Sequence, residues 1–274
     1  MYGAIYGDLI GSLYEYREYL LHNKELMIEA SKRDNLLSKE SFISDDTILT
    51  MAIADANLHN GDYDAYLRRY ILDNCDVLTK EDYFKYLFSP NMIKWAKGDR
   101  CGNSYGNGAI MRISPIASMG KSFIKVTYDT IAATTPSHNS ESAIKAALCV
   151  SHMIFLASQG AEVSYIKDVV DNYFKYDYEF DLDKLRTNMK FNYSCDDTMP
   201  LVLYSLFNSD SFDSAMRLCL SLGGDTDTNC AIVGSIAEHM YGMDDELKIQ
   251  VIDYLPNEYK LLLRKCSNNF TVNK

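Results

Sequence analysis

The sequence predicts an all-α protein, a compact multi-helix bundle formed by a single domain that spans residues 1–274. Apolar residues recur with helical spacing along most of the chain, whereas the alternating apolar pattern of strands is scarce. Hydrophobic residues make up 47% of the chain, which is ample for one extensive core. With 5 Pro and 14 Gly in total, no linker rich in Pro, Gly and Ser divides the sequence.

The apolar spacing also identifies the individual elements. An N-terminal helix carries Ile5 and Leu9, and a second helix follows Ser44 and runs to about Asn57. A long helix opens at residues 135–140 and ends near Gln159. Further helices are expected at 62–72, 164–176, 211–222 and 229–240. Short turns at Gly61, Gly160 and Gly223-Gly224 separate several of these segments.

Charge and cysteine content argue against some classes of protein. A net charge of −11 opposes nonspecific binding to a nucleic-acid backbone, so no stable nucleic-acid partner is expected. An acidic chain can still bind a small anion where metal ions and helix N-termini supply positive potential. Seven Cys without a Cys-x-x-Cys pair fit free thiols in a reducing compartment. With no signal segment and no uncharged apolar run of about 18 residues, we expect a cytoplasmic monomer with no membrane partner.

The first motif with chemical potential is Ser44-Asp45-Asp46-Thr47, at the start of a helix. One interpretation is structural: Ser44 caps the helix and the two acids complement its dipole. The other is metal binding, because adjacent carboxylates in a partly buried site need a cation, and hard oxygen ligands suit Mg²⁺ or Mn²⁺.

The second motif is Gly223-Gly224-Asp225-Thr226-Asp227-Thr228, which also precedes a helix. The glycines permit a sharp turn, after which Asp225, Asp227 and the Thr228 hydroxyl are clustered within one helical turn. A capped helix after a Gly-Gly turn is the structural alternative to a metal site.

A third motif lies in the N-terminal helix, where Asp8 and Glu15 are seven residues apart. On a continuous helix this spacing puts both acids on one face, with Gly11 leaving room between them. Solvated surface charge is the structural alternative.

The fourth motif is the Gly- and Asn-rich segment 103–108, which leads into Ala109 and Met111. Its composition predicts a loop whose backbone N–H groups are free to bind a ligand such as a diphosphate. A surface turn explains the composition equally well, since no nucleotide-binding glycine fingerprint is matched.

His138 forms the fifth motif, within Thr135-Pro136-Ser137-His138-Asn139-Ser140 at the entrance of the long helix. A lone histidine at such a position commonly caps or packs. Its place between a loop and a helix also suits contact with a ligand.

Taken in this order, these blocks resemble the ADP-ribosylglycohydrolase family. The resemblance runs from Gly3 to about Gly242 and rests on an N-terminal Gly-Asp with a later Glu, Asp-Asp-Thr, Gly-Asn-Gly-Ala-x-Met-Arg-x-x-Pro, Ser-His-x-Ser and Gly-Gly-Asp-Thr-Asp-Thr. It implies an all-helical fold with a centre of two divalent cations, Mg²⁺ or Mn²⁺. It also implies hydrolysis of the N- or O-glycosidic bond between ADP-ribose and a modified protein side chain or small conjugate.

The resemblance assigns roles to individual residues. It implies metal binding by Ser44, Asp45, Asp46, Asp225, Asp227 and Thr228, with Glu15 as a mobile acid at the same centre. Ser44 departs from the family pattern, which usually has Thr, but it keeps the hydroxyl. Implied contacts to diphosphate and ribose fall on Asn103, Ser104, Tyr105, Gly106, Asn107 and His138, and an adenosine contact falls on Tyr193.

The chemistry expected of such a centre is attack of an activated water on the anomeric carbon. A carboxylate such as Glu15 or Asp225 would move the proton, with Asp45 as a further catalytic acid, and nearby carboxylates would stabilise an oxocarbenium-like transition state. The leaving group would meet the segment 89–101, which includes Trp95 and Asp99.

A second Asp-Asp-Thr at Asp196, Asp197 and Thr198 is interpreted as a structural cap, with Pro200 in the first helical turn. A third pair of aspartates facing the same metals would exceed the charge of two divalent ions.

Two other functions remain possible on the sequence. Asp225-Thr226-Asp227-Thr228 superficially resembles the nucleophile motif of haloacid-dehalogenase-type phosphatases, which requires a preceding buried strand; residues 216–222 are helix-like. The second is a catalytically inactive family member that binds ADP-ribose or serves structurally, against which the intact ligand set argues.

Overall fold

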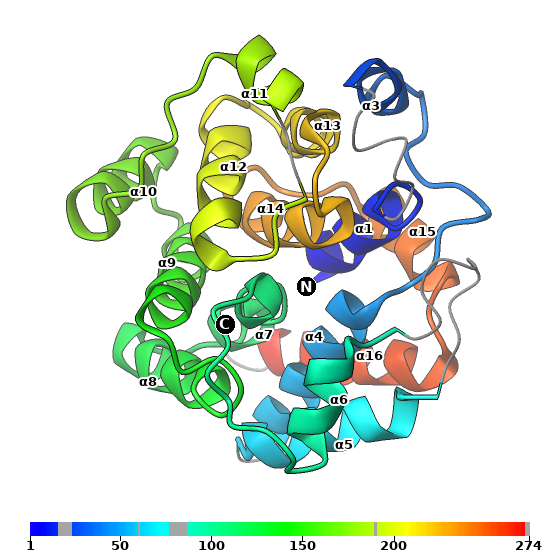
Figure 1. Cartoon of the computed structure of the whole chain (residues 1–274), viewed down its shortest axis with the longest axis vertical. Helices are drawn as coiled ribbons and strands as arrows, with labels where there is room; N and C mark the ends of the chain where they lie inside the picture. The colour runs from blue at the N-terminus through cyan, green and yellow to red at the C-terminus, as the bar shows by residue number, and fades with distance from the viewer. Residues whose placement is uncertain (16–23, 60, 77–86, 189–190, 272–274) are drawn as a thin grey trace.

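The computed structural model describes residues 1–15, 24–59, 61–76, 87–188 and 191–271. The regular structure in these ranges is helical, which confirms the all-α prediction (Figure 1). The elements, in chain order, are α1 (Tyr2–Gly11), α3 (Lys24–Ser31), α4 (Asp45–Leu58), α5 (Tyr63–Asn74), α6 (Pro90–Ala96), the 3₁₀ turn η1 (Asn107–Ala109), α7 (Ser114–Ser118), α8 (Phe123–Thr134), α9 (Glu141–Ser158), α10 (Val163–Val169), the π-helical turn η2 (Val170–Phe174), α11 (Leu182–Asn188), α12 (Cys195–Phe207), α13 (Phe212–Leu222), α14 (Thr226–Met240), α15 (Asp245–Asp253) and α16 (Asn257–Thr271).

Serine hydroxyls mark where many of these helices begin. The side chains of Ser44, Ser140 and Ser211 accept hydrogen bonds from backbone N–H groups in the first turns of α4, α9 and α13. The predicted turn residues Gly61, Gly160, Gly223 and Gly224 all have positive φ. The segment 164–176 is less regular than predicted, because α10 passes into η2 and ends at Lys175 with φ 54°.

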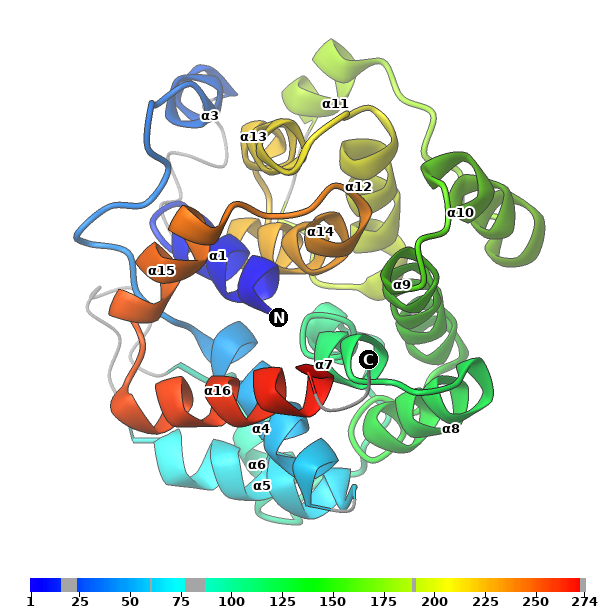
Figure 2. The ribbon, with the colours of Figure 1, turned by 180° about the vertical axis from the view of Figure 1, so that it is seen from behind.

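The centre of the fold is the pairing of α1 with α14, which lie side by side in both views (Figures 1 and 2). Glycines on α1 allow the two backbones to approach closely. A Cβ on Gly7 would stand 2.0 Å from the carbonyl oxygen of Cys230, and one on Gly11 would stand 2.4 Å from the Cα of Asp227. The N-terminal segment is therefore held against the first turns of α14, where the second aspartate motif lies.

Helix α9 is long and apolar enough, by length and composition, to cross a membrane, and 56% of it is buried inside the protein. It packs against α7, α8, α12 and α14. These contacts are those of a core helix, and they place its N-terminus beside the loop that precedes η1.

Candidate active site

The first turn of α4 is held by an aspartate from another helix. Asp8 of α1 accepts hydrogen bonds from the backbone N–H groups of Ser44 at 2.9 Å and Thr47 at 3.1 Å, and also from the Thr47 hydroxyl. Ser44 in turn accepts from the N–H of Asp46 at 3.2 Å. Asp8 therefore caps α4 across 36 residues of sequence, and this contact fixes the direction of the Asp45-Asp46 pair.

The start of α14 is held just as firmly. Gly223 and Gly224, with φ of 77° and 80°, turn the chain after α13. The Thr226 hydroxyl donates to the carbonyl of Gly11 at 2.9 Å, which ties the start of α14 to the end of α1. Because α13 is a helix, the strand that a haloacid-dehalogenase-type nucleophile motif requires does not precede these aspartates.

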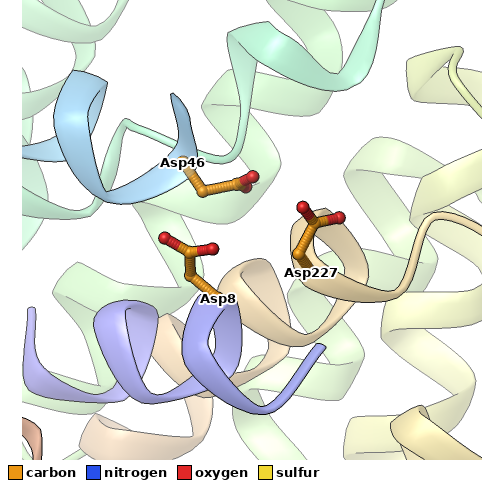
Figure 3. A group of neighbouring side chains, drawn as sticks. All are labelled: Asp8, Asp46 and Asp227. Carbon is orange, nitrogen blue, oxygen red and sulfur yellow. The ribbon is translucent and has the colours of Figure 1, made fainter. Parts of the chain in front are cut away.

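Acids from the ends of three helices converge between these elements. Figure 3 shows Asp8, Asp46 and Asp227 pointing toward one another from α1, α4 and α14. In this group, and in a second one formed by Glu15, Asp225 and Asp227, one carboxylate oxygen from each residue lies within 4.8 Å of those of the other two. Asp227 belongs to both groups, so the arrangement can hold two neighbouring cations with a shared ligand.

Glu15 reaches the site by a different path from the one predicted. Helix α1 ends at Gly11, so Asp8 and Glu15 do not lie two turns apart on one helix face. The space beside Gly11 is filled by the backbone of Asp227. A turn over residues 12–15 returns the chain toward α14 and brings Glu15 to Asp225.

The electrostatics of this cluster oppose the ionised form of its acids. Burial and the negative charge of Asp227 raise the pKa of Asp8 to about 7. The same two causes raise the pKa values of Asp45, Asp46 and Asp225 well above their usual range. Within the described ranges, no Lys, Arg or His forms an ion pair with Asp8, Asp45, Asp46 or Asp225. A cation from outside the chain would relieve this repulsion.

The donor atoms fit a divalent cation. Oδ1 of Asp46 and Oδ1 of Asp225 are buried and find no hydrogen-bond partner among the described residues. Buried carboxylate oxygens left in this state are suitable ligands for Mg²⁺ or Mn²⁺. The Ser44 and Thr228 hydroxyls lie beside them, bonded to Asp46 Oδ2 at 3.0 Å and 3.3 Å. Asp45 lies outside the two tight groups and lines the adjoining cavity.

A cavity of about 750 Å³ opens from the acid cluster, which is within the size range of small-molecule sites. Glu15, Asp45, Asp225 and Thr228 line its acidic end. The predicted substrate contacts also line it: Asn103, Ser104, Tyr105, Gly106, Asn107, His138 and Tyr193. Tyr105 and Tyr193 are 52% and 57% exposed, and their ring centroids lie 6.2 Å apart.

Several backbone N–H groups of the loop 102–107 are not free to bind a ligand, contrary to the prediction from its composition, because they bond within the protein. The N–H of Ser104 donates to Ser137, that of Gly106 to Ser104 Oγ, and that of Asn107 to Tyr193. Two isolated bridges, Asn103 with His138 and Gly106 with Ser194, clamp the loop between the starts of α9 and α12. The loop is therefore a rigid wall, and at these three positions its N–H groups serve the fold.

The side chain of Asn107 faces the acids. Its amide donates to Asp225 Oδ2 at 2.7 Å. Asn192, which the sequence did not single out, accepts from the backbone N–H of Asp225 at 3.0 Å and donates to Thr198 and Asn229 at 2.8 Å. Asn107 therefore orients the carboxylate of Asp225, and Asn192 orients its backbone.

The second Asp-Asp-Thr lies apart from the acid cluster. Asp196 and Asp197 are exposed at the start of α12, and Ser194 is its N-cap. Pro200 lies inside α12, in its second turn, and not in the first turn as predicted. Thr198 is buried and accepts from Asn107 and Asn192, so this motif supports the site through its threonine.

The segment 89–101 lines the cavity, although it is not a loop throughout. Ser89 caps α6, and Trp95 is buried with its indole N–H donating to Pro136 at 2.7 Å. Asp99, expected at the entrance, is exposed and does not line the cavity. Arg100 does line it and donates to Asn91 at 2.6 Å.

Known proteins resemble this chain in sequence and in fold. Over 162 residues it is 23% identical to the ADP-ribosylarginine hydrolase Tri1 of Pseudomonas putida (strain GB-1), and the match covers 55% of this chain and 42% of that protein. A solved structure described as an ADP-ribosylglycohydrolase-related protein complex has a TM-score of 0.65 at 18% identity, over 95% of this chain and 92% of that one. The likeness to that structure concerns the fold alone. The sequence model of ADP-ribosylglycohydrolases matches residues 1–266, and the chain therefore belongs to the ADP-ribosylglycohydrolase family.

Proposed function

We propose that this protein is a hydrolase that uses two divalent cations, Mg²⁺ or Mn²⁺, to release ADP-ribose from a modified target. The observation that carries the proposal is the pair of acid groups that share Asp227 at the end of the cavity. Family membership over residues 1–266 supports the ADP-ribosyl substrate class. The buried, unpartnered oxygens of Asp46 and Asp225 support the need for cations.

The residues that would hold the cations are Glu15, Ser44, Asp45, Asp46, Asp225, Asp227 and Thr228. When bound, the cations supply Lewis acids that lower the pKa of a water molecule and orient sugar hydroxyls. Asp8 belongs to the first acid group, but its oxygens also cap the first turn of α4, so the first cation would rest mainly on Asp46 and Asp227. The capping contact from Asp8 would orient Asp46. Asn107 and Asn192 would orient Asp225.

The acids that line the cavity would carry out the proton transfer. Glu15, Asp45 and Asp225 face the space where a sugar would lie, and all three line the cavity. Glu15 or Asp225 would accept the proton of the attacking water, and the negative charge around the anomeric carbon would stabilise positive charge in the transition state.

The rest of the cavity would bind the ADP-ribose moiety. The rigid loop 103–107 and His138 would contact the diphosphate and ribose, and Tyr193 would contact the adenine with its exposed ring. The relative named for its action on ADP-ribosylarginine makes arginine-linked ADP-ribose the first substrate to test. Seven free thiols suit the reducing environment of the cytoplasm, which belongs to the same proposal, as does a monomeric state.

The test is release of ADP-ribose from arginine-linked, serine-linked and base-linked conjugates, each with Mg²⁺, with Mn²⁺ and with chelator. We expect turnover of at least one conjugate that requires a divalent cation and is lost in Asp225→Ala and Asp45→Ala. Full activity of either variant contradicts the site assignment. Tight binding of ADP-ribose without turnover of any conjugate supports a non-catalytic family member instead.

A further inference from the structure

A line of hydrogen bonds runs from the protein interior to the cavity wall through three side chains. Arg112 is fully buried, and its Nη2 donates to Ser137 Oγ at 2.6 Å and to the carbonyl of Ala133 on α8 at 3.2 Å. Ser137 Oγ lies 2.7 Å from Nδ1 of His138. Ser137 and His138 both line the cavity, so the line ends where a ligand would bind.

The donors along this line determine where the histidine proton lies. A guanidinium can only donate, so Ser137 Oγ accepts from Arg112 and has one hydrogen to give. That hydrogen goes to Nδ1 of His138, and a neutral imidazole that accepts at Nδ1 carries its proton on Nε2. If Nδ1 carried the proton, both neighbours of Ser137 Oγ would be donors. The hydroxyl hydrogen would then lack an acceptor among the described residues.

The imidazole is also held in the neutral form. Burial, and then the positive charge of Arg112, lower the pKa of His138 well below its usual range. A charged imidazolium would bring a second buried cation next to the guanidinium. The ring therefore has one N–H and one acceptor nitrogen, and the acceptor is already used by Ser137.

Two glycines leave space beside the protonated nitrogen. A Cβ on Gly108 would stand 3.2 Å from His138 Nε2, and one on Gly106 would stand 3.8 Å from it. Gly106 lies in the loop and Gly108 in η1, and both line the cavity. The two glycines therefore keep side-chain atoms away from Nε2 on this wall of the cavity.

We propose that Arg112 and Ser137 are positioning residues that fix His138 as a neutral Nε2–H donor aimed into the cavity. Such a donor suits a phosphate oxygen and excludes His138 as the general base. The identity of the acceptor as a diphosphate oxygen rests on the proposed function. The position of the proton does not, because the contacts that fix it lie within the chain.

The test is nuclear magnetic resonance of metal-free protein labelled with ¹⁵N in its histidine rings. The chain has five His, so His138→Gln identifies the ring by the loss of its signals. We expect a pyrrole-type Nε2 and a pyridine-type Nδ1 for His138 at neutral pH. A pyrrole-type Nδ1, or an imidazolium, at His138 overturns the proposal.

Variants of Ser137 test the line itself. Ser137→Ala removes the donor to Nδ1, so we expect a mixture of tautomers and ADP-ribose binding about tenfold weaker. Ser137→Thr keeps a hydroxyl and is expected to restore the single tautomer. The control is Ser140→Ala, which removes the cap of α9 three residues away and should lower stability without changing the His138 signals. An unchanged tautomer in Ser137→Ala overturns the role of Ser137.

Either proposal can fail while the other stands. If the Nε2–H form is found but ADP-ribose neither binds nor is released, the proposed function fails and the positioning of His138 stands. If conjugates are hydrolysed while Nδ1 carries the proton, the positioning proposal fails and the function stands.

Discussion

The amide of Asn107 donates to Oδ2 of Asp225 at 2.7 Å, although the two residues are 118 positions apart. This bond connects the loop that lines the cavity with the carboxylate group proposed to hold a cation. Because Asn192 fixes the backbone N–H of the same aspartate at 3.0 Å, Asp225 is held at both ends. Its second oxygen, Oδ1, is left as the one available for a cation or a proton.

Asn107→Leu should therefore weaken cation binding without unfolding the protein. The variant removes one donor and leaves Asp225 less well oriented, and loss of such an outer contact commonly reduces metal affinity about 10- to 100-fold. Calorimetric titration with Mn²⁺ measures the change. The control is Asn91→Leu, since Asn91 lines the same cavity but bonds Arg100, and its Mn²⁺ affinity should stay at the wild-type value. Equal affinities for wild type and Asn107→Leu would contradict the orienting role.

Asp46→Asn should stabilise the metal-free protein while abolishing metal-dependent release of ADP-ribose. The substitution removes an acid whose ionised form is opposed by burial and by the charges of Asp227, Asp8 and Asp45. We expect the free energy of unfolding to rise by roughly 1–2 kcal/mol. For a chain of this size, each kcal/mol raises the melting temperature by about 2–4 °C. Thermal unfolding in chelator, beside an activity assay with Mn²⁺, measures both effects.

The matched control for that variant is Asp196→Asn, an exposed acid of the second Asp-Asp-Thr. Its melting temperature and activity should both equal those of the wild type. A metal-free Asp46→Asn protein that melts below the wild type would show that the carboxylate is stabilising, and the repulsion argument would then be wrong.

The sequence predicted most of the helices for local reasons, whereas most of the acids in the cluster were implied by the family resemblance. Capping serines such as Ser44 and Ser211, followed by apolar residues at helical spacing, define where helices start. Asp46 and Asp227 were predicted as neighbours because each opens a helix within a motif of the family.

The contacts that the sequence did not reveal are those that depend on tertiary structure. The bond from Ser44 to Asp8 spans 36 residues, and no periodicity within α1 or α4 reports it. Asn192 lies in no motif, and Arg112 appeared only as the Arg of a family motif, with no prediction that it is buried. The end of α1 at Gly11 was also missed, because the apolar pattern continues to Leu13 and Tyr14, which are buried beyond the helix.

The buried acids should make the metal-free protein lose stability as the pH rises from 5 to 8. The buried His138, His152 and His239, whose pKa values are lowered, act in the opposite direction. The pKa of Asp8 is raised to about 7 in the folded state from 3.8, so the folded state binds more protons than the unfolded state between these values. This contribution is fully present below about pH 4 and is lost as the pH rises through 7. The raised pKa values of Asp46 and Asp225 act in the same direction, and the total is on the order of a few kcal/mol.

Denaturant unfolding in chelator at several pH values measures this slope, and Asp8→Asn should make it shallower. Saturating Mn²⁺ should raise the melting temperature more at pH 8 than at pH 5, since protons compete with the cation for the same oxygens. An Asp8→Asn protein with the same pH dependence of stability as the wild type would contradict this role of Asp8.

Gly11→Ala should disrupt the fold and the site together. A Cβ at this position would stand 2.4 Å from both the Cα and the backbone nitrogen of Asp227 and 2.4 Å from the carbonyl oxygen of Thr226. Since these are backbone atoms, no side-chain rotation relieves the clash, and α1 must move away from α14. The movement would separate Asp8 from Asp227 and break the bond from the Thr226 hydroxyl to Gly11. We expect a loss of several kcal/mol in stability and of Mn²⁺ binding.

Gly160→Ala is the control that separates crowding from backbone strain. Gly160 has φ of 81°, and a Cβ there meets nothing within 4 Å. Its substitution should cost about 1–2 kcal/mol through the left-handed conformation alone, with Mn²⁺ affinity unchanged. Denaturant unfolding and Mn²⁺ titration of the two variants measure the difference. If Gly11→Ala matched Gly160→Ala in both, the close approach of α1 to α14 would not be what brings Asp8 and Asp227 together.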